Sequence, residues 1–419
     1  MEAVAKFDAI PDRPEHSGPT LRGLSPLGLV VIVVIIATGI LVFRTGSPSG
    51  PAGSASASVT SGASTPTAAA STAAATTPSA AVTPTASVSA PAASPAAATR
   101  LTQIDLPGPA YDLTFDRARD SLWYAVMGSG SRAGLYQYAI ATGQTSSWTL
   151  PATTHNGFLG RVAVAPDGSV WVTEEYSVVR VDPASGHVTT HTFPLADADA
   201  IPGALDTNPS PGTWPTAIAF DSQGLALVAR HNVRSLTRLD SSIRVVGRVQ
   251  LPAAIVGPSD LVDSNGVIYA APYMGSGPAV LLSENGVSIG STAEDVGRLG
   301  LYGTSVAAIG STGLTRIAPD ATMTQWQAGL YGGPNDRLAL VEGGAALYLD
   351  GPGLIEWISP SGAVEGRMSF ASVPIQVTNP LGQTVTALSR DQVGAIAADG
   401  TGSVWYVDTT LNKLVHVTW

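Results

Sequence analysis

A six-residue apolar pattern recurs along most of this chain at a regular interval. It reads SLWYAV from Ser121, SVWVTE from Ser169, GLALVA from Gly224, GVIYAA from Gly266, SVAAIG from Ser305, AALYLD from Ala345 and SVWYVD from Ser403. Successive copies start roughly 40–60 residues apart, which is the period of repeat folds such as propellers. A unit of this size cannot bury its own faces, so it must stack against further copies of itself.

The clearest copy of the whole unit runs from Arg161 to Leu195. Its sequence, RVAVAPDGSVWVTEEYSVVRVDPASGHVTTHTFPL, contains four short strand-like runs separated by turn residues. Runs of this kind with PDG and DPASG between them predict an antiparallel meander. The repeat therefore predicts an all-β chain folded as a seven-bladed β-propeller. A β-sandwich is the alternative, but nothing in a sandwich requires this period.

The two ends of the repeat region complement each other. The last copy stops at Trp419 without a fourth strand, whereas Leu101–Pro107 precedes the first copy and resembles a fourth strand. We expect Leu101–Pro107 to pair with the C-terminal strand, because closing the ring removes two exposed sheet edges. The propeller is thus predicted to span residues 101–419.

The residues before the repeat contain one long apolar run. LGLVVIVVIIATGILVF, residues 27–43, has no charged residue. With its flanks it approaches the roughly 20 residues of a spanning helix. We predict an uncleaved transmembrane anchor there, because the run is longer than the core of a typical signal peptide and 26 residues precede it. A cleaved signal sequence is the alternative.

Basic residues suggest how this anchor is oriented. Lys6, Arg13 and Arg22 precede the run and only Arg44 closely follows it, which predicts a cytoplasmic tail over residues 1–26. Residues 44–100 consist almost entirely of Ala, Ser, Thr, Pro, Gly and Val, a composition that predicts a disordered stalk. The propeller is then expected outside the cytoplasm, tethered to the cell membrane by a single pass.

The repeat resembles the streptogramin B lyase (virginiamycin B lyase) family of seven-bladed propellers, and more loosely the NHL and SMP-30-like propellers. The residues that carry the resemblance are VAVAPDGSVWVTE from Val162, VVRVDPASGHV from Val178 and GSVWYVD from Gly402. The resemblance covers roughly residues 101–419. It implies a metal ion, usually magnesium, held by Glu and His at one mouth of the central channel, with a His as base.

This chain departs from that family at the start of the inner strands, where the family places Pro-His pairs. The corresponding positions here are Ala110-Tyr111, Leu159-Gly160, Pro215-Thr216, Pro258-Ser259 and Pro334-Asn335. Only Glu174 falls on the family's WFTE pattern. If the chain is a lyase or lactone hydrolase, the candidate catalytic residues are Glu174 and neighbouring mouth carboxylates, with His155 or His231 as the base. A His that acts as a general base would also need a partner to orient it.

Polar residues of the repeats are expected at one channel mouth, on the segments that enter each first strand and leave each second strand. They are Asp112, Arg161, Glu174, Glu175, His231, Asp260, Arg298, Asp336, Arg337, Asp350, Asp391 and Asp408. Carboxylates in a ring could bind Ca²⁺ or Mg²⁺ through oxygen ligands. Alternatively, these Asp residues form ion pairs with the arginines.

We therefore expect a binding module for an unknown ligand, protein or glycan, with the metal-dependent enzyme and a purely structural envelope role as alternatives. Two insertions, Asp197–Thr213 and Ser372–Arg390, lengthen connections between units and could enlarge a binding surface or have no role in binding. The net charge of −10 and the lack of a basic stripe argue against nucleic acid as the partner.

Overall fold

The computed structural model describes most of the repeat region. The described residues are 94–126, 134–151, 159–194, 197–201, 214–272, 277–329, 336–350, 352–370, 373–378, 384–389, 393–400 and 402–419. They belong to one compact unit, Val88–Trp419. Their regular structure is entirely β, and no helix able to cross a membrane occurs among them. The predicted tail and anchor, and most of the predicted stalk, lie outside the described residues.

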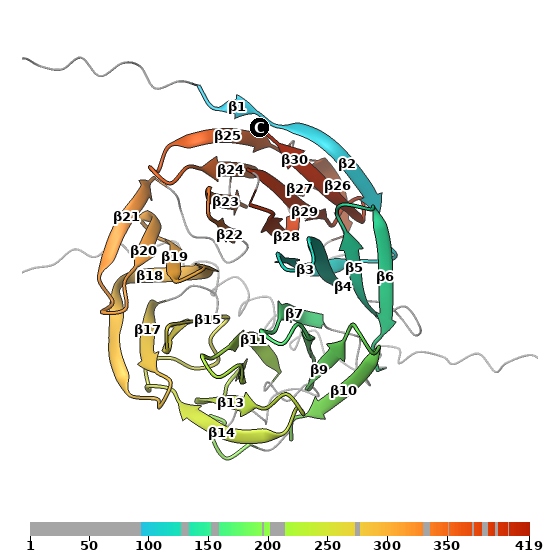
Figure 1. Cartoon of the computed structure of the whole chain (residues 1–419). Coiled ribbons are helices and arrows are strands. Elements are labelled where there is room, and N and C mark those ends of the chain that lie inside the picture. Colours follow the sequence, from blue (N-terminus) through green and yellow to red (C-terminus); the bar gives the residue numbers. More distant parts are fainter. Residues whose placement is uncertain are drawn as a thin grey trace, which may run out of the picture. The chain divides into compact units, whose positions relative to one another are not determined.

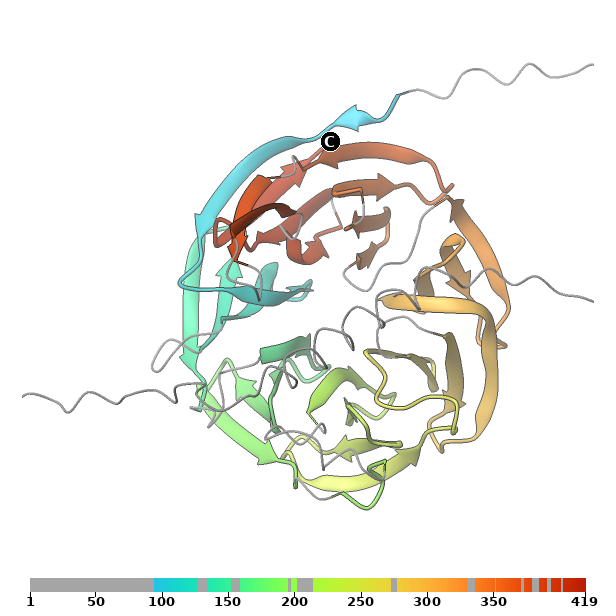
Figure 2. The same ribbon diagram turned by 180° about the vertical axis from the view of Figure 1, so that it is seen from behind.

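The strands form antiparallel sheets of consecutive strands arranged in a ring (Figures 1 and 2). The first sheet contains β3 (Ala110–Asp116), β4 (Ser121–Val126), β5 (Gly134–Ala139) and β6 (Gln144–Thr149). The second contains β7 (Leu159–Val164), β8 (Val170–Glu174), β9 (Ser177–Asp182) and β10 (His187–Thr192). The third contains β11 (Pro215–Phe220), β12 (Ala226–Arg230), β13 (Ser235–Leu239) and β14 (Val245–Gln250).

The next sheet continues through one long strand that two meanders share. It contains β15 (Asp260–Ser264), β16 (Val267–Ala271), β17 (Pro278–Ser283), β18 (Ser288–Tyr302), β19 (Ser305–Gly310), β20 (Gly313–Ile317) and β21 (Met323–Ala328). The part of β18 up to Asp295 pairs with β17, and the part from Val296 pairs with β19. One strand is therefore outermost in one meander and innermost in the next.

The remaining sheets use both ends of the described chain. One contains β22 (Arg337–Val341), β23 (Gly344–Leu349), β24 (Leu354–Ile358) and β25 (Val364–Ser369), with β1 (Ala96–Ala97) added at its outer edge. The last contains β28 (Val393–Ala398), β29 (Ser403–Asp408), β30 (Lys413–Thr418) and β2 (Thr99–Asp105). Strands β3, β7, β11, β15, β22 and β28 lie nearest the centre of the ring in Figure 1.

The predicted closure of the ring is confirmed. Strand β2 pairs with β30 in antiparallel register from Thr99 opposite Thr418 to Asp105 opposite Lys413. Order extends further toward the N-terminus than the predicted stalk boundary at residue 100, because β1 also pairs with β25 in parallel. The two residues of β1 are exposed alanines. The strand needs no buried side chain, because it pairs through backbone groups at the edge of a sheet.

The recurring apolar pattern corresponds to the second strand of each four-stranded meander. All six residues of β4, β23 and β29 are buried. Each second strand has a partner strand on both sides and packs on both faces, so it lacks the polar alternation of a half-exposed strand. This double burial explains why these strands are the easiest part of the repeat to recognise.

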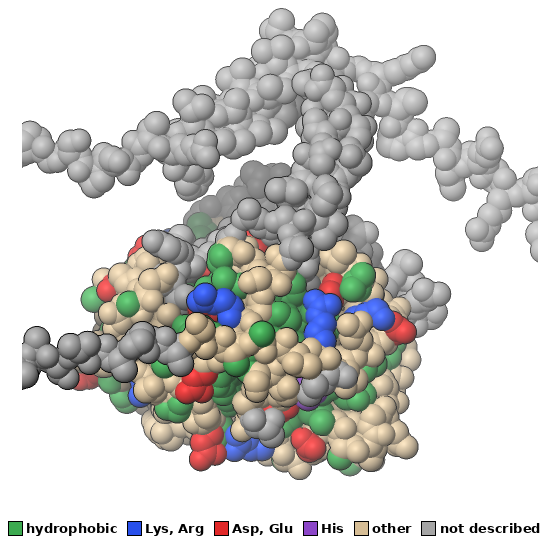
Figure 3. Space-filling model, turned by 90° about the horizontal axis from the view of Figure 1, so that it is seen from above, with side chains coloured by type: hydrophobic (Ala, Val, Ile, Leu, Met, Phe, Trp, Pro, Cys, Tyr) green, Lys and Arg blue, Asp and Glu red, His purple; other side chains and the backbone are tan. Residues whose placement is uncertain are grey.

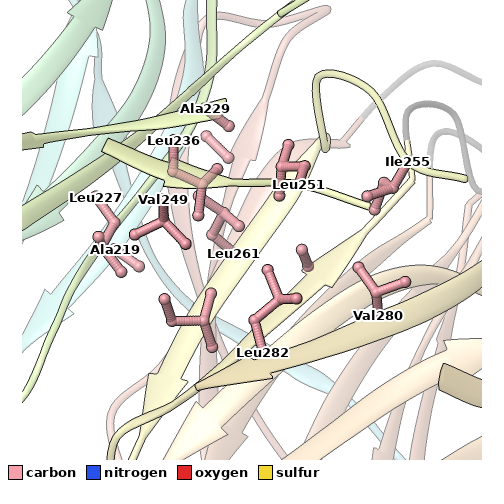
Figure 4. Close-up of a cluster of buried hydrophobic side chains, with 13 residues drawn as sticks. Ala219, Leu227, Ala229, Leu236, Val249, Leu251, Ile255, Leu261, Val280 and Leu282 are labelled. Carbon is pink, nitrogen blue, oxygen red and sulfur yellow. The ribbon is translucent and has the colours of Figure 1, made fainter. Parts of the chain in front are cut away.

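Hydrophobic clusters join each sheet to its neighbours around the ring. Figure 4 shows one of them, in which Leu227 and Leu236 of one sheet meet Leu261 and Leu282 of the next. Another cluster joins the two ends of the repeat region, because it combines Leu122 of the first sheet with Trp405 of the last. Packing between sheets and strand pairing therefore both close the ring.

The two insertions differ in what the structure describes. Of the first, only Asp197–Ile201 is described, and the Asp197 carboxylate is buried against Arg230. The second forms a separate hairpin of β26 (Val373–Thr378) and β27 (Thr384–Ser389) between β25 and β28. On the side of the ring seen in Figure 3, acidic, basic and hydrophobic side chains are interspersed.

One buried carboxyl should make stability depend on pH. Asp263 accepts a hydrogen bond from the Gly266 amide (3.3 Å), and its Oδ2 is buried without a hydrogen bond among the described residues. Burial, with repulsion from Glu284 and Asp221, raises the pKa of Asp263 to about 6, although Arg238 counteracts it. The pKa of this carboxyl is about 4 in the unfolded chain and is raised by folding. Such a group lowers the free energy of unfolding as the pH rises from the unfolded pKa through the folded pKa.

We therefore expect Asp263→Asn to stabilise the fold at pH 7 by about 1–2 kcal/mol, and to give little gain near pH 4. Urea unfolding at both pH values measures this. The matched control is Asp105→Asn, because the Asp105 side chain is 88% exposed and pairs only at the surface with Lys413. An Asp263→Asn variant that is destabilised equally at both pH values would show that the carboxylate is instead needed for structure.

Candidate functional site

A cavity of about 180 Å³ lies at the centre of the ring. We call it the arginine cavity, and strands β3, β7, β11, β15, β18, β22 and β28 all contribute to its wall. Its lining residues are Asp112, Leu113, Thr114, Arg161, Val162, Ile218, Asp260, Arg298, Leu299, Arg337, Leu338, Ala395 and Ile396. Five of the residues predicted at the channel mouth are thus brought together: Asp112, Arg161, Asp260, Arg298 and Arg337.

Irregular pairing of the inner strands coincides with this cavity. The register of β3 against β4 shifts between Ala110 and Leu113, next to Asp112. Equivalent shifts occur in β7 between Leu159 and Val162, next to Arg161, and in β18 at Arg298. Such bulges redirect side chains and are frequent beside functional sites, so they help place charged groups among strands made mostly of small and apolar residues.

Two aspartates satisfy amides of the neighbouring inner strands. Asp112 accepts a hydrogen bond from the amide of Val162 (2.7 Å), and Asp260 accepts one from the amide of Leu299 (3.1 Å). An innermost strand has no strand partner on its channel side, so its inward amides need other acceptors. Both carboxylates therefore link adjacent sheets at the cavity wall.

Arg161 lies between these two carboxylates. Its Nη1 is 3.6 Å from Oδ1 of Asp112, and its Nη2 is 3.5 Å from Oδ1 of Asp260. Nη2 also donates to the carbonyl oxygen of Ser259 (2.9 Å). Burial acts to lower the pKa of Arg161, but attraction by Asp260 and Asp112 outweighs it, so the pKa lies above its usual value. Around Arg161, the cavity therefore contains the Asp–Arg ion pairs that were the predicted alternative to a metal site.

Arg298 and Arg337 bring two further guanidinium groups to the cavity wall. Nε of Arg298 donates to the Asp336 carbonyl oxygen (3.2 Å), and Nε of Arg337 donates to the Gly394 carbonyl oxygen (3.0 Å). The described lining therefore contains three guanidinium groups and two carboxylates. Burial, with repulsion from Arg161 and Arg337, lowers the pKa of Arg298 to about 9. Burial and Arg161 also lower the pKa of Arg337.

Other predicted site residues make local contacts away from the cavity lining. Glu174 is 2% exposed and accepts a hydrogen bond from the Ser177 hydroxyl (2.6 Å), and burial raises its pKa. The His231 ring stacks on Trp214, with ring centroids 4.3 Å apart. Asp408 accepts hydrogen bonds from two amides of the turn that follows it. These contacts are those of turn and sheet stabilisation.

The remaining predicted residues are divided between described and undescribed parts of the chain. Asp336 accepts a hydrogen bond from the amide of Asp350 (2.8 Å), which in turn accepts one from the Tyr348 hydroxyl (3.2 Å). Glu175 has a buried Oε2 without a hydrogen bond among the described residues. His155 and Asp391 lie outside the described residues.

Among the described residues, the donor set at the channel does not fit a divalent cation. No group of three His, Asp or Glu side chains arranged to hold a metal ion occurs in the described part of the chain. The two carboxylates in the cavity already accept amide hydrogen bonds and face Arg161. Three arginines also raise the electrostatic cost of bringing a metal cation there.

The sequence did not reveal the apolar part of the cavity wall. Leu299, Leu338 and Ile396 line it beside the arginines. In the sequence they stand in short apolar stretches that do not differ from stretches of core residues. The available signal was the direct adjacency of Arg298 to Leu299 and of Arg337 to Leu338 at the start of two such runs.

The fold is shared with solved propellers. Virginiamycin B lyase from Staphylococcus aureus superposes with a TM-score of 0.56 at 14% identity, over 76% of this chain and 98% of that one. A second streptogramin B lyase structure gives 0.56 at 12% identity, over 76% and 96% of the two chains. The chain is a β-propeller. The lyase resemblance predicted from the sequence is thus confirmed for the fold.

Propellers of other kinds are also similar. The WD40 domain of Pan2 from Neurospora crassa gives a TM-score of 0.51 at 13% identity, over 77% of this chain and 95% of that domain. No protein-family model and no curated protein matches this sequence. Identities this low define the architecture, and the chemistry must be inferred from the chain's own residues.

Proposed function

We propose that this chain is a ligand-binding propeller that takes an anion into the arginine cavity. The observation that carries the proposal is the convergence of three guanidinium side chains, those of Arg161, Arg298 and Arg337, on one cavity at the centre of the ring. Arginine is the side chain best suited to bind carboxylate and phosphate groups, because its planar guanidinium presents several donors at once.

Anion binding in this cavity would be favourable because its partly buried guanidinium groups repel one another. The lowered pKa of Arg298 means that the surrounding protein disfavours its charged form, although it remains protonated at neutral pH. An anion between Arg298 and Arg337 would offset this repulsion and accept charge-assisted hydrogen bonds. A ligand would therefore stabilise the site more than water does.

The binding function is preferred to a metal-dependent lyase or lactone hydrolase. One similar structure is a catalytically inactive virginiamycin B lyase with quinupristin, so the fold can accommodate such chemistry. Here, however, Glu174 is held by Ser177, and His231 is stacked on Trp214, away from the described cavity lining. The chain also lacks the Pro-His pairs of the family it resembles.

Around this site we infer seven blades and a membrane tether. The pairing of the described strands and the hydrophobic cluster between each pair of neighbouring meanders support this count.

The apolar run at residues 27–43 and the Ser/Thr/Pro-rich residues 44–100 support an anchored, extracytoplasmic propeller. Protease added to intact cells should then release the propeller, whereas protection until lysis would contradict this orientation.

Calorimetric titration of the unit Val88–Trp419 with phosphate, sulfate and acetate tests the binding function. We expect binding of at least one anion, weakened about tenfold or more in Arg298→Gln and in Arg337→Gln, because each substitution removes charge-assisted hydrogen bonds. Arg244→Gln is the matched control, since Arg244 is 76% exposed and pairs with Asp240 at the surface.

Two results would contradict the proposal. One is the absence of binding for every anion. The other is Mg²⁺ or Ca²⁺ binding that is lost in Glu174→Gln and accompanied by opening of a lactone substrate, which would support the enzyme alternative.

A further inference from the structure

The arginine cavity continues into a wider cavity along the inner strands. This second cavity, which we call the wide cavity, has a volume of about 620 Å³ and is formed by β3, β18, β22 and β28. Thr114, Leu338 and Ile396 are among the residues that line both cavities. The two cavities are therefore parts of one channel.

The wide cavity extends to the end of the channel at which the inner strands finish. Tyr302 is the last residue of β18, Val341 is the last of β22 and Ala398 is the last of β28, and all three line the cavity. Arg117, the first residue after β3, lines it as well. We call this end the second mouth, because the arginine cavity lies nearer the opposite end.

The Arg117 side chain lies across the second mouth. Its guanidinium carbon is 4.9 Å from the centroid of the Tyr302 ring, and its Nη1 is 3.9 Å from Oε2 of Glu342. The Tyr302 hydroxyl donates to the same carboxylate oxygen (2.9 Å). Arg117 follows β3, whereas Glu342 follows β22, and β28 lies between these two strands around the ring (Figure 1). The side chain therefore spans from one inner strand to others beyond its neighbour.

The last sheet leaves room for this crossing. Gly400 lies in the turn that follows β28, and Nη2 of Arg117 is 3.1 Å from the position that a Cβ would take on this glycine. A side chain at Gly400 would therefore crowd the guanidinium and displace it from its place beside the last sheet.

The contacts that hold Arg117 are weak enough to break often. The side chain of Arg117 is 56% exposed and that of Glu342 is 78% exposed. Ion pairs and cation–π contacts at such exposure contribute little, and together they favour this position by only about tenfold. Exposed side chains change rotamer within nanoseconds. Arg117 can therefore swing away from the mouth and return.

We propose that Arg117 is a gate at the second mouth and that ligands enter the channel past it. In the closed position the guanidinium over Tyr302 narrows the mouth, so only small molecules pass. In the open position the full width of the wide cavity is accessible. The gate selects by size and not by charge, because the charges of Arg117 and Glu342 cancel, so it goes beyond the proposed function and serves any ligand of the channel.

Thiol labelling of the unit Val88–Trp419 tests the gate, because the chain contains no cysteine and an introduced thiol is the only one present. Thr114→Cys places a thiol of similar size where the two cavities meet. In this background, Arg117→Ala should raise the labelling rate of a bulky uncharged maleimide about tenfold, and that of iodoacetamide less than about twofold. Glu342→Gln removes only the ion pair and should raise the bulky rate about two- to fourfold.

The ratio of the two labelling rates separates gating from thiol reactivity. Loss of the Arg117 charge alters the thiolate fraction, which affects both reagents equally. Arg244→Ala is the matched control, since Arg244 is 76% exposed and lines neither cavity. Val287→Cys measures the labelling of a thiol outside the channel, because Val287 is 66% exposed. Thermal unfolding shows whether each variant is folded before labelling.

Two results would overturn the gate. One is an unchanged ratio of bulky to small labelling in Arg117→Ala, because the reagents would then reach the thiol by another route or without hindrance. The other is a Thr114→Cys thiol that neither reagent labels even in Arg117→Ala, because the second mouth would then admit no ligand. Neither result depends on anion binding, so the gate can fail while the proposed function stands.

Discussion

A chain that begins at Gly108 is expected to lose most of its stability, because it lacks the strand that closes the ring. Removing β2 breaks its pairing with β30 and takes away Leu106, which is buried between the first and last sheets. Lost hydrogen bonds at about 0.5–1.5 kcal/mol each and lost apolar burial together amount to roughly 5–10 kcal/mol. That is comparable to the whole stability of a typical domain.

The matched control is a chain that begins at Ala98, which lacks β1 and keeps β2. It should stay within about 1 kcal/mol of the unit Val88–Trp419, because β1 pairs with β25 only at Ala96 and Ala97. Urea unfolding compares the three chains, and light scattering should detect aggregation of the shortest one through the exposed edge of β30. Equal stability of all three would contradict ring closure by β2.

Asp197→Asn is expected to destabilise the propeller by about 3–5 kcal/mol, because it breaks a buried ion pair and leaves a buried cation. The side chains of Asp197 and Arg230 are both fully buried, and Arg230 also lies over the Phe193 ring. Burial acts to raise the pKa of Asp197, but hydrogen bonds from Arg248, from the Asp199 amide and from Arg230 outweigh it and lower the pKa.

A carboxyl whose pKa is lowered by folding contributes stability above its unfolded pKa, about 4, and that contribution is lost as pH falls toward the folded pKa. The difference between the parent chain and Asp197→Asn should therefore be largest at pH 7 and shrink below pH 4. Chemical unfolding over this pH range measures it, with Asp105→Asn as the exposed control. A loss below 1 kcal/mol at pH 7 would show that the pair is dispensable.

The architecture could be predicted because its signals are local and repeated. The second strands are buried on both faces, so their apolar runs remain recognisable in every copy. Closure could be predicted because the surplus strand at one end and the missing strand at the other end complement each other. The continuous strand β18 could not be predicted, because no turn sequence separates its two halves. One half pairs with β17 and the other with β19.

The candidate site could be predicted only in outline. The position of Arg161, Arg298 and Arg337 near the start of inner strands follows from the repeat. Which charges meet depends on the bulges in β3, β7 and β18 and on contacts between neighbouring sheets, for which a single sequence carries no direct signal. Glu174 lies at the end of a second strand as expected, but the hydroxyl of Ser177 holds it.

The channel arginines are proposed to bind an anion. Anomalous diffraction from crystals of the unit Val88–Trp419 soaked in bromide tests this most directly, because it locates the ion instead of inferring its position. We predict a bromide peak in contact with the guanidinium groups of Arg298 and Arg337, which disappears when both residues are replaced by Gln. Bromide bound only on the outer surface, with the arginine cavity left unoccupied, would contradict the claim.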